Sequence, residues 1–422
     1  MKTKVLVFVL CLFLLVSASG VFAAAVQEQE QEQKELTILT WNISFFEETI
    51  KGWIADFEKD NSEYNVQWID KHGTELDAFL MTQLAAGEMP DIIDFQGSLY
   101  SKYAAMGALT PLGDYIKNDP ETKNRYDQGL LDIALAFEGE TYEVPFYYAP
   151  TLLYYNKLMF KEAGITRPPE TFDELMSYAQ RMTKNEKSGF MTINFDWIYW
   201  PLFRVNGVQL LTPDNKKAAF NTPAAVKTLE TLSKLTASGA ITRISWTKRW
   251  AELNDAFAAG IIGMFNSNST TYHNVKANGD WINEDTMGIA PFPGGWKVSG
   301  QHGFAISALS KHPEGAWELL KVITNDKWGQ SFAKQTNILT GNKAVDKWYM
   351  NQPAIKDDPL NYALIDIIMS NSEKITGHFP LAQEARIKDA FFTSIQGALL
   401  GDTSAKDALN KAEAEVNKIL AE

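Results

Sequence analysis

The sequence predicts an α/β protein of two lobes, each a mostly parallel sheet flanked by helices, joined by a hinge of several chain segments. At 422 residues the chain is too long for one ordinary hydrophobic core. Strand-like and helical patterns alternate near the start and in the middle of the chain, which favours parallel strands connected by helices. An aromatic segment punctuated by prolines, residues 142–175, lies between these two runs and predicts the passage from one lobe to the other.

Residues 1–23 have the layout of a secretory signal peptide. Lys2 and Lys4 precede an apolar run over residues 5–16, and small residues surround the expected cleavage site. The apolar run is too short for an ordinary membrane span. Residues 24–35 are polar and repetitive, and we expect them to form a flexible spacer. The sequence therefore predicts a periplasmic or otherwise extracytoplasmic protein that is secreted with a cleavable signal.

The cysteine count and the net charge limit the kind of protein and ligand. Cys11 is the single cysteine and lies in the apolar run, so we expect no disulfide after cleavage. Val9 and Leu10 are not the small residues that precede a lipid-modified cysteine, so a lipid anchor is not expected. The net charge is −13, and loss of Lys2 and Lys4 would make it −15. This acidity argues against nucleic acid and anionic lipid as partners and favours a neutral ligand.

Residues 36–147 are predicted to form the first part of lobe 1. Strands are expected at residues 36–41, 66–69 and 91–95, with helices between them. In parallel sheets of this kind, ligands bind beyond the carboxyl ends of the strands. Polar and aromatic residues at these ends are therefore candidate ligand contacts.

The rest of the chain is predicted to complete both lobes. Residues 148–301 form the first part of lobe 2, where Thr171 and Glu174 make a capping box that begins a helix. Residues 302–352 return to lobe 1, and residues 353–422 are helices that complete lobe 2 and the hinge. The expected strands of lobe 2 are residues 152–155, 190–195, 261–266 and 287–290.

No motif indicates catalysis or a metal site. The sequence contains no glycine-rich phosphate loop, no Gly-x-Ser-x-Gly elbow and no calcium loop, and its five histidines lack metal-ligand spacing. Asp91 and Asp94 are three apart on a predicted strand, so their side chains point to opposite faces. They therefore do not form the close carboxylate pair of a glycosidase. No cofactor is expected.

Several aromatic and polar residues fall at predicted strand ends or in loops. An aromatic ring can pack against the C–H face of a sugar, while polar side chains bind its hydroxyl groups. The rings are Trp41, Tyr147, Tyr148, Trp197, Trp200 and Trp296. The candidate polar contacts are Asn42, Asp77, Asp94, Gln96, Asn266, His302 and Arg386. Ordinary packing explains any single ring equally well, and it is the set as a whole that favours a ligand site.

Seven segments support a more specific interpretation because of their order and spacing. They are residues 84–93, 109–115, 144–165, 169–175, 256–264, 291–295 and 316–320. Together they resemble the family 1 extracellular solute-binding proteins of bacterial ABC importers, the group that includes maltose-binding protein. The resemblance implies a periplasmic-binding-protein-like fold whose two lobes close over a ligand. It also implies that the closed form is presented to the transmembrane subunits of an ABC permease.

The resemblance also implies particular ligand contacts. Trp41 matches a tryptophan beside the first-strand loop, Asp77 falls near an acidic sugar contact, and Trp197 matches a ring that stacks on the ligand. Two positions differ from the maltose binder. Residues 266–268 are small and polar where it has a tryptophan, and Ser98 stands where it has an acidic residue. Both differences favour a glycan other than maltodextrin.

The favoured hypothesis is a monomeric, non-enzymatic protein that binds a neutral mono- or oligosaccharide between the lobes by hinge closure. Two alternatives remain, a secreted glycoside hydrolase and the same fold binding a polyol, inositol or phosphorylated polyol. A phosphorylated ligand would need several basic residues in the cleft. The candidates for that role are only Lys71, Arg204 and Arg386. On the crossing at residues 145–151, Tyr147 and Tyr148 are the rings expected to face the ligand.

Overall fold

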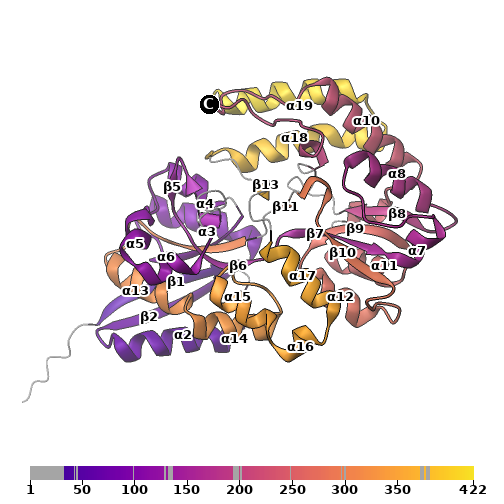
Figure 1. Ribbon diagram of the computed structural model, residues 1–422. Coiled ribbons are helices and arrows are strands. Elements are labelled where there is room, and N and C mark those ends of the chain that lie inside the picture. Colours follow the sequence, from indigo (N-terminus) through magenta and orange to yellow (C-terminus); the bar gives the residue numbers. More distant parts are fainter. Residues whose placement is uncertain are drawn as a thin grey trace, which may run out of the picture.

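The computed structural model contains two main sheets in two separate lobes, each covered by helices (Figure 1). The predicted two-lobed α/β architecture is therefore confirmed. The expected signal peptide and most of the spacer lie outside the described residues. The structure describes residues 33–41, 43, 46–97, 99–127, 130–131, 136–192, 199, 202–247, 249–295, 297–298, 301–370, 375–376 and 381–422.

The sheet of lobe 1 has five strands in the order β2-β1-β3-β12-β6. These are β1 (Lys34–Trp41), β2 (Tyr64–Lys71), β3 (Ile92–Gln96), β6 (Val144–Tyr148) and β12 (Gln301–Ile306). Strand β1 pairs in parallel with β2 and β3, whereas β12 is antiparallel to both β3 and β6. All strands except β12 therefore run in the same direction. Strand β1 begins two residues before the predicted strand, inside the expected spacer.

Helices cover both faces of this sheet. Successive residues of β3 point to opposite faces, so Ile92 packs in the cluster that contains Trp53 and Ile93 in the cluster that contains Tyr103. The helices are α2 (Glu47–Asp60), α3 (Gly73–Ala85), α4 (Leu99–Ala105), α5 (Gly113–Asn118), α6 (Pro120–Arg125), α13 (Pro313–Ile323), α14 (Asp326–Thr336) and α15 (Lys343–Met350). The short strands β4 (Ala136–Phe137) and β5 (Glu140–Thr141) form a hairpin beside them.

The sheet of lobe 2 has four strands in the order β10-β7-β9-β8. These are β7 (Thr151–Asn156), β8 (Ser188–Thr192), β9 (Ile262–Asn268) and β10 (Met287–Ala290). Strand β7 is antiparallel to β9 and β10, and β8 is parallel to β9. Each lobe thus has one reversed strand, β12 or β7. Both reversed strands come directly after the chain has crossed from the other lobe. The crossing brings the chain to the edge where the other strands end, so the next strand has to run in the opposite direction.

Two helices of lobe 2, which begin at residues 172 and 223, have the capping residues that the sequence predicts. The Thr171 hydroxyl accepts the backbone N–H of Glu174 at 3.2 Å, as the predicted capping box requires, and Thr222 accepts from Ala225 at 3.2 Å. The helices are α7 (Lys157–Glu162), α8 (Phe172–Met182), α10 (Pro223–Ala237), α11 (Trp250–Ala258), α12 (Thr271–Asn278), α18 (Glu384–Leu400) and α19 (Ala405–Leu420). Helices α18 and α19 pack on each other and on α10.

Several segments pass between the lobes. Strand β6 leads to β7 through residues 149–150 alone. Two short strands, β11 (Lys297–Val298) and β13 (Ile375–Thr376), pair in parallel between the lobes. The helix α17 (Pro359–Met369), preceded by α16 (Pro353–Lys356), contacts both α15 of lobe 1 and β10 of lobe 2. The chain thus joins the lobes at more than one place, as the predicted multi-segment hinge requires.

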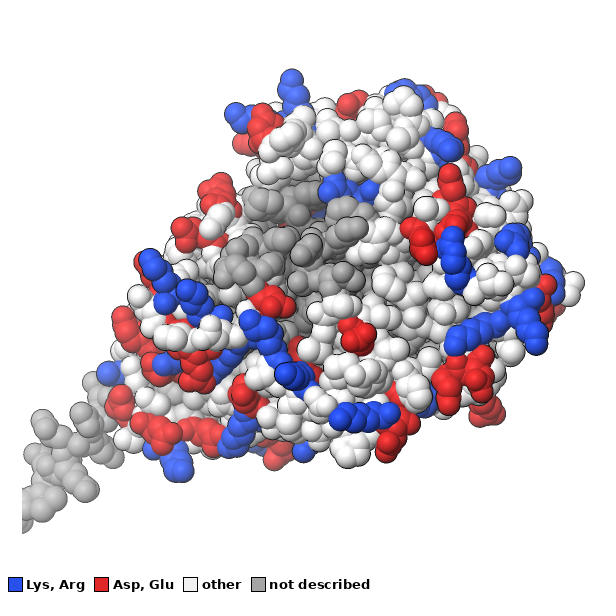
Figure 2. Space-filling model, viewed as in Figure 1, with Lys and Arg blue, Asp and Glu red and all other residues white. Residues whose placement is uncertain are grey.

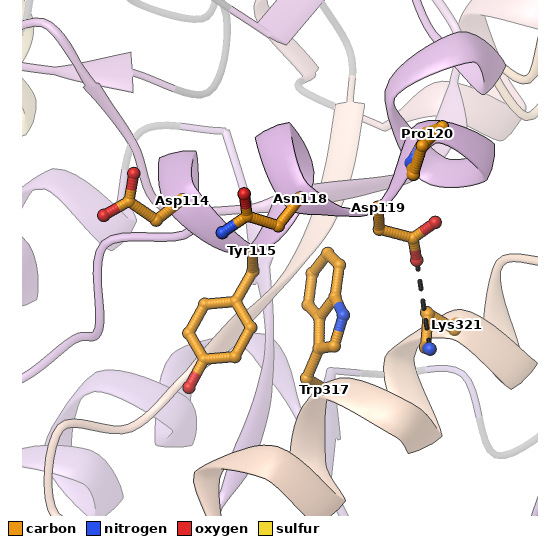
Figure 3. Close-up of a pocket in the computed structure, with 7 residues that line it drawn as sticks. All are labelled: Asp114, Tyr115, Asn118, Asp119, Pro120, Trp317 and Lys321. Carbon is orange, nitrogen blue, oxygen red and sulfur yellow. Dashed lines mark ion pairs between the residues drawn. The ribbon is translucent and has the colours of Figure 1, made fainter.

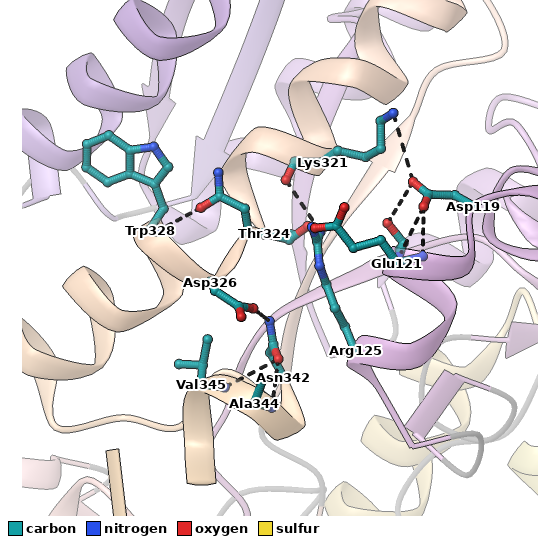
Figure 4. A network of polar contacts seen from close by, with 12 residues as sticks. Asp119, Glu121, Arg125, Lys321, Thr324, Asp326, Trp328, Asn342, Ala344 and Val345 are labelled. Carbon is teal, nitrogen blue, oxygen red and sulfur yellow. Dashed lines mark hydrogen bonds and ion pairs between the residues drawn. The ribbon is translucent and has the colours of Figure 1, made fainter. Parts of the chain in front are cut away.

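A buried polar network attaches the returning segment to the first part of lobe 1. Arg125 at the end of α6 is 7% exposed. Its Nη1 donates to the carbonyl oxygen of Lys321 (3.4 Å) and to the hydroxyl of Thr324 (3.2 Å), while Nη2 pairs with Glu121 (Figure 4). In the same view, the Asn342 amide donates to Asp326 at 2.9 Å and its oxygen caps α15. Arg125 therefore connects two parts of the sequence that are almost 200 residues apart.

Replacing Arg125 by methionine is expected to lower the free energy of unfolding by about 2–3 kcal/mol, because hydrogen bonds from a charged donor to buried acceptors are lost. Glu121 is 77% exposed and can be hydrated in the variant. Arg249→Met is the matched control, because Arg249 is 76% exposed and pairs with Glu252 at the surface; it should leave unfolding almost unchanged. Urea denaturation measures both variants, and equal midpoints would contradict the structural role of Arg125.

Candidate functional site

The candidate site lies where the edges of the two sheets face each other. In lobe 1, β1, β3 and β6 end at one edge and β12 begins there; in lobe 2, β8 and β9 end at one edge and β7 begins there. Because β6 leads directly into β7, these two edges lie close together. Acidic and basic side chains are mixed over the outer surface that the described residues present in Figure 2. This is the edge at which the sequence predicts ligand contacts.

Four predicted contacts come together at the edge of lobe 1. Asp94 of β3 is fully buried, and its Oδ2 accepts the backbone N–H of Trp41 at 3.1 Å. Its Oδ1 lies 3.0 Å from Nδ1 of His302 on β12. The imidazole ring contacts two aromatic rings, that of Trp41 at 5.3 Å and that of Tyr147, stacked at 4.3 Å. Trp41, Asp94, Tyr147 and His302 therefore form one group, which we name the lobe 1 group.

The hydrogen bond to Asp94 determines how His302 can act. A carboxylate only accepts hydrogen bonds, so the ring carries its hydrogen on Nδ1. In the neutral ring Nε2 is then an acceptor. His302 is 1% exposed, and its Nε2 is buried without a hydrogen-bond partner among the described residues. A buried polar atom without a hydrogen bond lowers the stability of the folded protein by about 1–3 kcal/mol. Such an atom is therefore a candidate to form a hydrogen bond with a ligand.

The edge of lobe 2 contains a second set of unpaired polar atoms. Asn266 of β9 is fully buried, and neither its amide oxygen nor its amide nitrogen has a partner in the part of the chain that the structure describes. Thr192 at the end of β8 pairs with it in register, and the Thr192 hydroxyl is also buried and unpaired there. By contrast, the Ser267 and Thr271 hydroxyls bond to each other at 2.6 Å. Asn266 and Thr192 therefore form the lobe 2 group, with unsatisfied donors and acceptors.

Two other predicted contacts are engaged elsewhere. The Asp77 carboxylate accepts from Lys102 at 2.7 Å and from the hydroxyl of Tyr103 at 2.8 Å, both within lobe 1. The Arg386 side chain is 55% exposed and pairs with Glu422 at 2.6 Å. The structure thus brings neither residue to the lobe 1 group or the lobe 2 group.

Tyr148 also lies apart from the lobe 1 group. Successive residues of a strand point to opposite faces, so Tyr147 and Tyr148 diverge. Tyr148 lines a small pocket of about 70 Å³ together with Asp127, Leu130, Gly341, Lys343, Asp346, Ile368 and Met369. Of the remaining predicted contacts, Asn42, Trp197, Trp200 and Trp296 lie outside the described residues, and only the backbone of Gln96 is described, at the end of β3.

A buried carboxyl group that no sequence pattern predicted lies next to this edge. Glu143 is fully buried, and neither carboxyl oxygen has a partner among the described residues. Burial, with the charge of Asp94, raises the pKa of Glu143 well above its ordinary value. A Cβ atom at Gly303 would lie 2.8 Å from the Glu143 Cβ, so the glycine makes room for this side chain. Nothing in the sequence signals this burial, because a glutamate beside a predicted crossing is ordinarily hydrated.

A buried ion pair on α18 was also missed. Glu384 and Lys388 are 1% and 5% exposed and pair with each other. They are four residues apart and share one face of the helix, whereas Arg386 between them points to Glu422. The spacing of four residues is visible in the sequence. Which face of α18 is buried cannot be predicted from it.

A separate pocket of about 480 Å³ lies between α5, α6 and α13 of lobe 1 (Figure 3). Tyr115 and Trp317 pack there with ring centroids 5.2 Å apart, and Trp317 is largely buried in the core. Asp119 caps α6 by accepting the N–H of Glu121 at 3.0 Å, and Lys321 pairs with Glu318 at 2.8 Å. Packing and helix capping account for these residues, and no predicted contact lines the pocket.

Within the described residues, every helix is too short or too polar to span a membrane. The same part of the chain contains no group of three or more histidine, cysteine, aspartate or glutamate side chains arranged to hold a metal ion.

Comparison with known proteins identifies the family. Residues 46–330 match the model of the bacterial extracellular solute-binding protein, which is more than half of the chain. The chain belongs to this family. This solute-binding protein is 25% identical to the maltodextrin-binding protein MdxE of Bacillus subtilis, over 86% of this chain and 87% of that protein. It is also 25% identical to the diacetylchitobiose binding protein DasA of Streptomyces coelicolor, over 69% and 71% of the two chains.

Solved structures show the same fold. The sugar-binding protein MalE of Xanthomonas citri superposes with a TM-score of 0.77 at 21% identity, covering 92% of this solute-binding protein and 98% of that chain. The GacH receptor of Streptomyces glaucescens superposes with a TM-score of 0.74 at 20% identity, covering 93% and 100%. The family resemblance predicted from the sequence is confirmed, and the family is one of binding proteins.

Proposed function

We propose that this solute-binding protein captures a neutral mono- or oligosaccharide between its lobes and delivers it to an ABC permease. The observation that carries the proposal is the presence of buried, unpaired polar atoms on both facing edges, His302 Nε2 in lobe 1 and the Asn266 amide in lobe 2. Rings of Trp41 and Tyr147 lie beside the first of them. Sugar hydroxyls both donate and accept hydrogen bonds, and so match an imidazole, an amide and a hydroxyl better than an ionic ligand does.

The charges near the site support a neutral ligand. Both oxygens of Asp94 are occupied, one by Trp41 and one by His302, so this carboxylate is not available to a cationic ligand. Arg386, one of the three basic residues that could bind a phosphorylated ligand, pairs with Glu422. The names of the relatives DasA and MdxE refer to diacetylchitobiose and maltodextrin, which supports carbohydrate as the ligand class.

The same observations disfavour the glycoside hydrolase alternative. A retaining or inverting glycosidase needs one carboxyl group as acid and another as nucleophile or base. Asp94 is held by two hydrogen bonds, and Glu143 is buried beside Gly303. This arrangement favours binding without catalysis.

Ligand capture is proposed to work by closure of the lobes. The lobe 1 group and the lobe 2 group belong to different lobes, so a ligand that bonds to His302 and Asn266 together reaches both only when the lobes are closed. Such a ligand has a higher affinity for the closed form and shifts the equilibrium towards it. The closed form would then be recognised by the permease subunits, with the protein acting as a monomer secreted by its signal peptide.

A thermal-shift screen tests the proposal. The panel contains glucose, maltose, maltotriose, diacetylchitobiose, myo-inositol and glucose 6-phosphate. At least one neutral saccharide is expected to raise the melting temperature, because a ligand at 100 times its Kd stabilises the folded state by about 2.7 kcal/mol. Small-angle scattering should show a smaller radius of gyration with the same sugar.

Each alternative has its own outcome in this design. A shift with glucose 6-phosphate or myo-inositol alone would replace the saccharide proposal by the polyol alternative. Release of nitrophenol from p-nitrophenyl glycosides would favour the hydrolase. No shift and no compaction with any neutral sugar would contradict the proposal.

A further inference from the structure

Helix α18 of lobe 2 reaches across to helix α4 of lobe 1 (Figure 1). The later turns of α18 belong to lobe 2, where Phe391 packs against Phe203 and Phe220 with ring centroids 5.3 and 4.9 Å away. The start of the helix contacts α4. One rigid helix therefore connects the core of lobe 2 to the surface of lobe 1, separately from the β6–β7 crossing.

The contact between the two helices is specific and buried. The Ser101 hydroxyl of α4 donates to the carbonyl oxygen of Leu381, just before α18, at 3.1 Å. Ser101 and Tyr100 are both 2% exposed. Tyr100 in turn donates to the carbonyl oxygen of Ala136 at 2.9 Å, which fixes α4 within lobe 1. Separation of the lobes here would break the Ser101 hydrogen bond and expose this surface to water.

Two charged groups lie at the same contact. Glu384 and Lys388 form their ion pair on α18 while nearly fully buried. The charge of Glu384 reaches Tyr100, where it adds to burial in raising the pKa of that hydroxyl, so the pair lies near α4. Burial of an ion pair has a desolvation cost that its own attraction often fails to repay. The contact therefore combines a buried hydrogen bond with a buried charge pair, and separation of the lobes would return both to water.

We propose that Ser101, Leu381 and the Glu384–Lys388 pair form a latch between the lobes, and that the latch sets the equilibrium between the open and closed forms. The inference rests on the closing motion of the proposed function. Residues that form hydrogen bonds between the lobes would then change ligand affinity by changing the fraction of closed molecules. Ser101 is a positioning residue in this scheme, because its hydroxyl bonds to Leu381 and acts through the arrangement of the lobes.

The test measures the distance between the lobes without any ligand. Cys11→Ser removes the single cysteine, and Glu88→Cys with Glu230→Cys then places one spin label on an exposed position of each lobe. Pulsed electron–electron double resonance should show mainly the open distance, with a smaller population at the short, closed distance. Ser101→Ala is expected to lower the ratio of closed to open molecules about fivefold, the loss of one hydrogen bond. Ser101→Glu, which adds a bulky charge, should remove the closed distance.

Ser394→Ala is the matched control. Ser394 is also a buried serine, 6% exposed, but it lies on a later turn of α18, so its removal should leave the distances unchanged. A wild-type chain without any closed population, or Ser101 variants with the wild-type distribution, would overturn the latch. If Ser101→Glu fails to fold by circular dichroism, Ser101→Ala decides alone.

The latch and the saccharide proposal fail in different ways. A sugar found in the thermal screen should bind Ser101→Ala about fivefold more weakly, because only the closed fraction completes the site. Distances that respond to Ser101 while no sugar binds would support the latch and contradict the saccharide ligand. A sugar that binds both variants equally, with unchanged distances, would contradict the latch alone.

Discussion

Replacing Asn266 by leucine is expected to stabilise the ligand-free protein and at the same time to weaken saccharide binding about 100-fold. The Asn266 amide is fully buried and unpaired within the described residues, so it destabilises the empty protein. Leucine has the same number and branching of side-chain heavy atoms and no polar atoms, and should raise the free energy of unfolding by about 1–3 kcal/mol. The ligand hydroxyl that would bond to the amide is then left buried and unpaired, so affinity should fall about 100-fold. Urea denaturation and sugar titration measure the two effects.

Asn254→Leu is the matched control for this prediction. Asn254 lies on α11, is 6% exposed, and its amide oxygen is also buried and unpaired in the described part of the chain. Its replacement should stabilise the protein in the same direction and leave sugar affinity unchanged. A destabilised Asn266→Leu protein would show that this amide has a structural role, and unchanged affinity would remove Asn266 from the binding site.

Replacing Asp94 by asparagine is expected to weaken saccharide binding about 100-fold, which is roughly 3 kcal/mol. Asp94 accepts one hydrogen bond from Trp41 and one from His302. An asparagine amide can accept through its oxygen alone. If its nitrogen faces His302, the ring hydrogen must move to Nε2, which changes from an acceptor to a donor towards the ligand. If its nitrogen faces Trp41, two N–H groups oppose each other and the end of β1 shifts.

Asp91→Asn separates this effect from a loss of stability. The Asp91 carboxylate accepts the backbone N–H of Thr37 at 2.8 Å and the hydroxyl of Ser310 at 2.5 Å, so it also makes two hydrogen bonds. Both variants should lower the free energy of unfolding by about 1–3 kcal/mol. Only Asp94→Asn should change sugar affinity and the nitrogen chemical shifts of His302, measured by titration and by NMR. Equal affinities of the two variants would contradict the role of Asp94.

Local patterns in the sequence predicted the elements and several contacts. The alternation of strand and helix patterns predicted two α/β lobes, and Thr171 with Glu174 predicted the start of α8. Strand ends predicted Trp41 and Asp94, and the structure brings both to one edge with Tyr147 and His302. These side chains lie together because parallel strands necessarily place their carboxyl ends at one edge, and their role as ligand contacts stays a prediction.

Other site features depend on which chain segments meet. Asp77 and Arg386 have the right chemistry for a sugar contact, but Lys102 and Glu422 engage them. Glu143 is buried only because Gly303, 160 positions later in the chain, leaves space for it. A local sequence pattern shows neither the ion-pair partners Lys102 and Glu422 nor the space beside Gly303.

The sequence by itself determined the α/β class, the division into two lobes and the kind of side chain available at the strand ends. These follow from hydrophobic periodicity and capping, which act over a few residues. Only the tertiary structure decided that β12 and β7 run against their sheets, that Asp94 holds His302, and that α4 meets α18. Each of these depends on contacts between segments far apart in the chain, where burial and pairing, and not local preference, select the arrangement.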